Sequence, residues 1–187
     1  MQKLLLFMPK AARLITADEL EHMPGTDHGC ELVKGRLIRM SPVGPVHGSI
    51  VVGFASMLHQ HVKSRRLGDV MTEVGFKLEF DPDTVRAPDI AFIRRERTTR
   101  GSRGFVKGGP ELVVEVLSSD DRPGEIREKI AEYLTHGVFV VVVVDPDDRT
   151  VTVHRPLTPP ATLVEDDELD LGDVVTGFTC RVREIFE

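Results

Sequence analysis

Residues 111–144 read ELVVEVLSSDDRPGEIREKIAEYLTHGVFVVVVV, and they predict a strand, a helix and a second strand. Its end, Val138 to Val144, is an unbroken apolar run, which is typical of a strand that is covered on both faces. Glu111 to Leu117 predicts a second strand. Between the two, apolar residues recur at every fourth position, so Gly124 to His136 predicts a helix. This strand–helix–strand order indicates a sheet with helices on its faces.

The sequence before and after this unit supplies the other predicted elements. Thr16 begins a short helix, because it forms a capping box with Glu19. Glu31 to Met40 alternates on both sides of a Lys-Gly pair, which predicts a hairpin. We further expect a long helix from His47 to about Arg66 and strands at Val70–Phe80, Val85–Ile93 and Thr150–His154.

These elements predict an α/β (α+β) fold in which a mixed sheet is flanked by helices and preceded by a helix and a hairpin. The length of 187 residues suits a single domain over residues 1–187, with a less regular acidic segment at 156–187. The two cysteines are far apart in the sequence, which favours reduced thiols. Every apolar stretch is far shorter than the roughly 20 residues of a membrane span, and the N-terminus is too brief for a secretory signal. We therefore expect a cytoplasmic protein without a membrane partner.

The charge is unevenly distributed along the chain. The 30 acidic residues outnumber the 24 basic ones, and a net charge of −6 argues against a polyanionic partner. Six basic residues nevertheless stand within one short stretch that holds a single acid: Arg94, Arg95, Arg97, Arg100, Arg103 and Lys107. The stretch fits contacts to a nucleic-acid backbone, and it also fits a solvated glycine-rich loop.

Two acids interrupt strands that are otherwise apolar. Asp89 precedes Ile90-Ala-Phe92, and Glu115 stands within Leu112–Leu117. A buried carboxylate costs several kcal/mol unless it is paired or binds a cation. Mg²⁺ prefers one or two carboxylates together with water, so the two acids are candidate metal ligands. The alternative is that they bond to a nearby arginine or to backbone N–H groups.

Lys129 adds a cation to this pair. Helical periodicity puts it beside the sheet-facing stripe of its helix and away from the acidic outer face. Its ammonium group could neutralise a transition-state phosphate or hold an attacking water molecule, both of which phosphodiester cleavage needs. The alternative is a side chain whose stem covers apolar surface while its charge reaches water.

Several short motifs, taken in order, resemble the Uma2 family of putative restriction endonucleases. They are Thr16-Ala-Asp-Glu-Leu20, Glu31-Leu-Val-Lys-Gly35, Met40-Ser-Pro42, His47, Pro88-Asp89, Pro110–Ser119, Glu128-Lys129 with Tyr133, Gly137-Val138 and Val144-Asp-Pro146. The resemblance covers roughly residues 14–155. It implies a restriction-endonuclease-like core of the PD-(D/E)XK superfamily, and an attack of water on a phosphodiester that depends on Mg²⁺, or on Mn²⁺ as a substitute.

The resemblance also assigns roles to individual residues. Asp89 and Glu115 match the metal-binding acids, and Lys129 matches the family's helix lysine. Glu31 and His47 match further positions thought to line the site, where we expect them to assist at its rim. The superfamily pattern asks for a lysine two residues after Glu115, and this chain has Leu117 there.

The leading hypothesis is therefore a metal-dependent endonuclease that acts on nucleic acid, with DNA as the expected substrate. A module of the same fold that binds nucleic acid without cutting it is the first alternative, motivated by Leu117 and the net charge. The second is an oligomeric scaffold whose acids form structural ion pairs. A homodimer or higher homo-oligomer is expected from the frequency of such assemblies.

Overall fold

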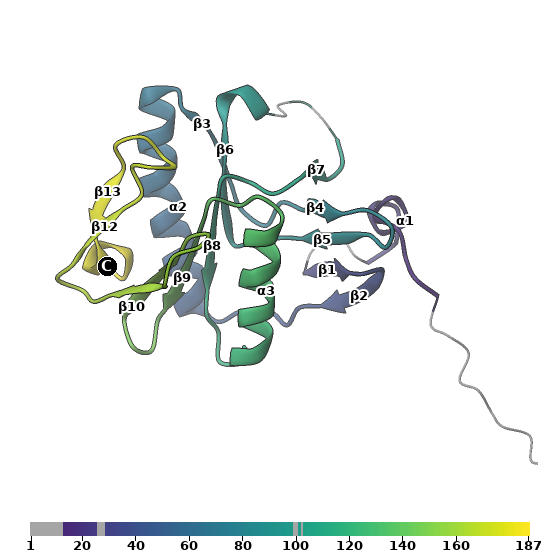
Figure 1. The fold of residues 1–187 in the computed structure, drawn as a ribbon. Coiled ribbons are helices and arrows are strands. Elements are labelled where there is room, and N and C mark those ends of the chain that lie inside the picture. The colour runs from purple at the N-terminus through teal and green to yellow at the C-terminus, as the bar shows by residue number, and fades with distance from the viewer. Residues whose placement is uncertain (1–12, 26–28, 99–100, 102) are drawn as a thin grey trace, which may run out of the picture.

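The structure is a computed structural model that describes residues 13–25, 29–98, 101 and 103–187 (Figure 1). Its larger sheet has six strands in the order β11-β10-β9-β8-β6-β3. Their bounds are β3 Gly68–Met71, β6 Ile90–Arg94, β8 Leu112–Val116, β9 Val140–Asp145, β10 Thr150–His154 and β11 Ala161–Leu163. Only β8 and β9 are parallel among these neighbours, because helix α3 (Pro123–Thr135) connects them as a crossover.

Strand β9 is buried on both faces, as its unbroken apolar run predicts. Val140, Val142 and Val144 pack with the apolar stripe of helix α2 (Pro45–Arg65). Val141 and Val143 point to the other face, where they pack with Ile130 and Tyr133 of α3. The two helices therefore cover opposite faces of the larger sheet (Figure 1).

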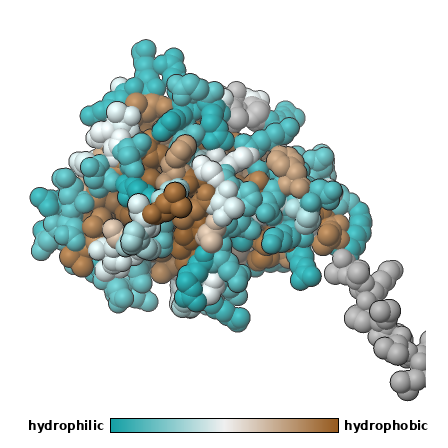
Figure 2. Space-filling model, viewed as in Figure 1, coloured by the Kyte–Doolittle hydropathy of each residue, from teal (hydrophilic) through white to brown (hydrophobic). Residues whose placement is uncertain are grey.

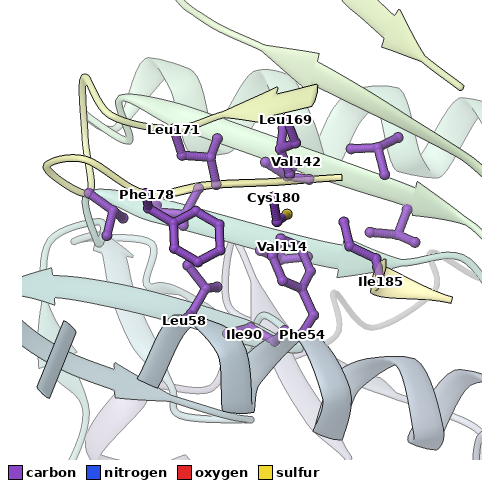
Figure 3. Close-up of a cluster of buried hydrophobic side chains, with 14 of the residues drawn as sticks. Phe54, Leu58, Ile90, Val114, Val142, Leu169, Leu171, Phe178, Cys180 and Ile185 are labelled. Carbon is purple, nitrogen blue, oxygen red and sulfur yellow. The ribbon is translucent and has the colours of Figure 1, made fainter. Parts of the chain in front are cut away.

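The C-terminal segment completes the core on the α2 side of the sheet. It contains β12 (Glu168–Asp170), β13 (Thr179–Arg181) and the short 3₁₀ helix η2 (Val182–Ile185). Leu169, Leu171 and Phe178 are buried there against Leu58 and Phe54 of α2 and residues of the sheet (Figure 3). A segment that is acidic in composition and short of regular structure thus supplies one wall of the larger hydrophobic cluster.

A second, five-stranded sheet has the order β2-β1-β5-β4-β7. Its strands are β1 Cys30–Val33, β2 Arg36–Arg39, β4 Phe76–Glu79, β5 Thr84–Arg86 and β7 Val106–Lys107. The predicted hairpin forms β1 and β2. Helix α1 (Ala17–Glu21) has the predicted capping box and packs its Ala17 and Leu20 on this sheet.

Two predicted strands are wrong in their extent, because the chain passes from one sheet to the other within each of them. Residues 70–80 form the end of β3 and then β4, and residues 85–93 form the end of β5 and then β6. The break in the first lies at Glu73, which has φ 54° and donates its backbone N–H to Pro88 in the break of the second. Alternation of apolar residues continues across the first break, so a period of two cannot reveal it.

Asp83 joins the smaller sheet to α1. Its Oδ2 accepts a hydrogen bond from the backbone N–H of Ala17 at 2.7 Å and another from Lys77 Nζ at 2.8 Å. Burial alone would raise the pKa of Asp83, but the Ala17 N–H and the Lys77 ammonium outweigh it and hold the pKa below its usual range. The ionised carboxylate therefore stabilises the folded state.

We expect Asp83→Asn to lower the free energy of unfolding by about 1.5–3 kcal/mol at neutral pH, the range for a charge-assisted hydrogen bond. Because the pKa of Asp83 is depressed on folding, this contribution is complete above the carboxyl group's unfolded pKa and disappears as the pH falls through the folded one. Urea denaturation at about pH 7 and about pH 3 measures the difference. Asp147→Asn, in an exposed turn, is the control; an equal loss at both pH values would contradict the assignment.

Candidate active site

Asp89 and Glu115 meet at the ends of two adjacent strands. Ile90 of β6 pairs with Val114 of β8 in antiparallel register, which puts Asp89, just before β6, opposite Glu115. The backbone N–H of Val116 donates to Asp89 Oδ2 at 2.7 Å. The two carboxylates are therefore brought together from positions that are distant in the sequence.

Helix α3 supplies the direct partners of Glu115. Lys129 Nζ lies 2.9 Å from Glu115 Oε1 and 3.0 Å from Oε2. The hydroxyl of Tyr133, one helical turn later, donates to Oε1 at 2.8 Å. Burial raises the pKa of Glu115 and, although Lys129 lowers it, the negative charges of Asp89 and Glu31 raise it further, to about 7. The carboxylate thus sits where a further positive charge would stabilise its ionised form.

Glu31 of β1 lies behind Lys129, with only 2% of its surface exposed. Its carboxylate accepts from Arg86 Nη1 at 2.7 Å and from the Ala87 N–H at 3.0 Å, and it lies 3.3 Å from Lys129 Nζ. Burial would raise the pKa of Glu31, but Lys129 and Arg86 together hold it below its usual range. Glu31 is accordingly an ionised residue of the interior. The expectation that it lies at the rim of the site is wrong.

His47 approaches Asp89 from the first turn of α2. Its Nε2 is 3.3 Å from Asp89 Oδ2, and this hydrogen bond raises the pKa of His47 against the opposing effect of burial. The Nδ1 atom is buried and has no hydrogen-bond partner among the described residues. All five residues that the sequence predicts for the site are therefore gathered in one region.

The charges of this network leave room for a divalent cation. Four carboxylates, those of Glu31, Asp89, Glu115 and Glu132, face two cations, Lys129 and Arg86. The net charge is −2 when all four carboxylates are ionised and His47 is neutral. Buried charge of this kind is normally paired or bound to metal. Asp89, whose side chain is 19% exposed, is the carboxylate that opens toward solvent.

The donor set fits Mg²⁺, which takes one or two carboxylates and keeps several water molecules. Asp89 and Glu115 are the residues that would hold it. No group of three or more His, Cys, Asp or Glu side chains is arranged as metal ligands within the described part of the chain. A metal at this place would accordingly complete its coordination with water or substrate.

The predicted basic stretch lies at the other end of β6. Arg94 ends the strand and Arg95 and Arg97 follow in η1 (Arg95–Arg97), about 16 Å from Asp89 at the rise of an extended strand. Arg97 donates to Glu111 at 3.0 Å and to the Gly109 carbonyl at 2.7 Å, so it holds its own loop. Arg95, Arg103 and Lys107 are exposed, and Arg100 lies outside the described residues.

A groove of about 600 Å³ opens beside His47, between α2 and β3. Val51, Val52, Ala55 and Val70 form most of its apolar wall, and no Lys or Arg lines it among the described residues. On the face of the molecule seen in Figure 1, Figure 2 shows apolar side chains near the middle within a largely hydrophilic border. The residues that line the groove therefore add no cation to the site.

Three residues of the network, Arg86, Glu132 and Tyr133, had no role predicted from the sequence. Arg86 stands three residues before Asp89, in a strand whose other members are uncharged, and it bridges Glu31 and Glu132. Tyr133 was named only as part of the family motif that contains Lys129. Its distance of four residues from Lys129 places both side chains on one helical face, which is the signal that could have identified it.

Comparisons with known proteins give a family and a similar fold. The model of the Uma2 family, described as "Putative restriction endonuclease", matches residues 17–183. The fold is similar to the crystal structure of a putative nuclease belonging to DUF820 from Anabaena variabilis ATCC 29413, with a TM-score of 0.80 and 24% sequence identity. That similarity covers 92% of this chain and 97% of the other. No curated protein matches the chain.

We expect Mn²⁺ to raise the melting temperature of the protein and EDTA to reverse the rise, because a cation that binds only the folded state stabilises it by about 2.7 kcal/mol at a hundredfold excess over Kd. Asp89→Ala and Glu115→Gln should each abolish the rise. Asp173→Asn, which removes an equal charge at the distant Arg155 pair, should retain it. The measurement is differential scanning fluorimetry across a metal titration, and a rise that persists in both site variants would exclude these ligands.

Proposed function

Since the chain belongs to the Uma2 family of putative restriction endonucleases, we propose that it is a Mg²⁺-dependent endonuclease that hydrolyses nucleic-acid phosphodiester bonds. The observation that carries the proposal is the convergence of Asp89, Glu115 and Lys129. Two carboxylates on neighbouring strands and a lysine in contact with one of them are the groups that this chemistry requires.

The chain's own residues divide the work of the reaction. When bound, the divalent cation would supply a Lewis acid that lowers the pKa of water and polarises the phosphate. Asp89 and Glu115 would hold it, and the ammonium group of Lys129 would orient the attacking water or offset negative charge that develops on the phosphate. His47 restricts the orientation of Asp89 through its 3.3 Å contact.

The helix lysine compensates for the strand lysine that the superfamily pattern contains and this chain lacks. Leu117 stands where a strand lysine is expected, two residues after Glu115. Lys129 reaches the same carboxylate from α3 at 2.9 Å, so a cation is present although its place in the sequence differs. This contact favours an active enzyme over the inactive module that Leu117 alone would suggest.

DNA is the proposed substrate, with the exposed residues Arg94, Arg95, Arg103 and Lys107 as proposed contacts to its backbone. Within the described residues no helix is long and apolar enough to cross a membrane. A homodimer and a cytoplasmic location stay predictions from the sequence.

The direct test is cleavage of supercoiled plasmid and of single-stranded DNA in Mg²⁺ or Mn²⁺. We expect nicking by the wild-type protein, none in EDTA, and a loss of at least about a hundredfold in Asp89→Ala, Glu115→Ala and Lys129→Met, as for removal of a metal ligand or of a transition-state charge. Asp173→Ala is the matched control.

Cleavage that survives in both Asp89→Ala and Glu115→Ala would overturn the assignment of the site. Binding without cleavage of any substrate, in the presence of bound metal, would favour the inactive module instead. Absence of both binding and metal-linked stabilisation would favour the scaffold.

The basic stretch makes a separate prediction about binding. Combined replacement of Arg94 and Arg95 by Gln should weaken binding to DNA of any sequence and reduce the slope of log K against log salt by about one for each phosphate that the variant no longer neutralises. Fluorescence anisotropy at several salt concentrations measures this slope. Arg183→Gln, an exposed arginine paired with Asp166, should leave it unchanged. An unaltered slope in the double variant would show that DNA lies elsewhere.

A further inference from the structure

Lys129 is shared between two carboxylates. Its ammonium group lies 2.9 and 3.0 Å from the two oxygens of Glu115, and 3.3 Å from Glu31 Oε1 on the other side. Only 9% of the residue is exposed, so water cannot readily take the place of either partner. The position of this cation therefore depends on the balance between Glu115 and Glu31.

We propose that Lys129 competes with a divalent cation for Glu115, and that Glu31 is a positioning residue that retains the ammonium group inside the site when the cation is bound. This inference rests on the proposed metal site at Asp89 and Glu115. It adds a role for Glu31 that is distinct from contact with metal or substrate.

The competition follows from how Glu115 is occupied. Lys129 contacts both of its oxygens, and Tyr133 donates to Oε1 as well. A divalent cation on the same carboxylate would lie within a few ångströms of the ammonium group, where like charges repel strongly in a poorly solvated interior. Binding of the cation must therefore weaken the contact between Lys129 and Glu115.

Glu31 is positioned to hold the ammonium group of Lys129 when its contact with Glu115 weakens. Pairing of Leu32 with Val85 in antiparallel register puts Glu31 opposite Arg86, and the guanidinium group and the Ala87 N–H fix its carboxylate. Arg86 is in turn tied to Glu132 of α3, the helix that carries Lys129. Glu31 thus has a fixed position next to Lys129 that does not depend on Glu115.

Glu132 provides a matched control for charge alone. It belongs to the same network and pairs with Arg86 as Glu31 does, but among the contacts of the described residues its carboxylate does not reach Lys129. Glu31→Gln and Glu132→Gln each remove one negative charge from the network. Only Glu31→Gln removes a carboxylate that contacts Lys129.

The test is calorimetric titration of the whole protein with Ca²⁺, together with its melting temperature in EDTA to establish that each variant is folded. Lys129→Met should bind Ca²⁺ at least about tenfold more tightly than the wild type. A cation in contact with a carboxylate lowers the affinity of that carboxylate for a proton by a factor of about ten or more, and we expect a comparable effect on Ca²⁺. Glu31→Gln should bind more weakly, and by a larger factor than Glu132→Gln.

A double-mutant cycle separates positioning from charge. If Glu31 acts through Lys129, the excess effect of Glu31→Gln over Glu132→Gln should disappear in the Lys129→Met background. Should Lys129→Met fail to fold, Tyr133→Phe, which removes one of the two donors on Glu115 Oε1 without changing charge, should still raise the affinity, by a smaller factor.

Unchanged or weaker Ca²⁺ binding in folded Lys129→Met would overturn the competition. Equal losses in Glu31→Gln and Glu132→Gln would overturn the retention by Glu31. Either result with intact, metal-dependent cleavage would leave the proposed nuclease standing. Conversely, the predicted affinities without any cleavage would uphold the inference while the proposed activity fails.

Discussion

The burial of Glu115 in an apolar strand is the constraint on which the rest of the site depends. A carboxylate at the centre of a sheet is costly unless positive charge and hydrogen-bond donors surround it. Here Lys129 and Tyr133 come from the crossover helix that follows the strand itself. The cost of Lys129 is offset in turn by Glu31, and that of Glu31 by Arg86. Each buried charge is thus offset by the next one, in a series that runs from Glu115 in the larger sheet to Glu31 and Arg86 in the smaller sheet.

The strand–helix–strand unit could be predicted because its signals are local. The apolar run of β9, the spacing in α3 and the capping box at Thr16 each depend on neighbours within a few residues. The division of the chain between two sheets could not be predicted in this way. It depends on contacts such as that between Glu73 and Pro88, which join two breaks in different strands. The core contributed by Leu169 and Phe178 was likewise hidden in a segment that is rich in acidic residues and short of regular structure.

The residues of the candidate site could be predicted more completely than their arrangement in space. Asp89 and Glu115 stood out because they are acids in apolar strands, and Lys129 because helical periodicity puts it beside the sheet-facing stripe. The family resemblance added Glu31 and His47. Their arrangement depends on strand register, which brings Arg86 opposite Glu31 and Asp89 opposite Glu115. Arg86 was overlooked for this reason, since an arginine in a strand has no meaning until its partner is known. The basic stretch is the opposite case, because its residues are neighbours in the sequence but have different surroundings in the structure. Arg97 donates hydrogen bonds to Gly109 and Glu111 at the end of its own loop.

The contacts of the charged network also differ in when they can form during folding. Glu115 and Lys129 belong to consecutive elements and can meet as soon as α3 docks on β8, whereas Glu31 lies far earlier in the sequence and must be brought back by closing a long loop. A partly folded chain would therefore hold an incomplete set of charges. The full network joins residues from Glu31 to Tyr133, so it is complete only when the smaller sheet has been brought against α3.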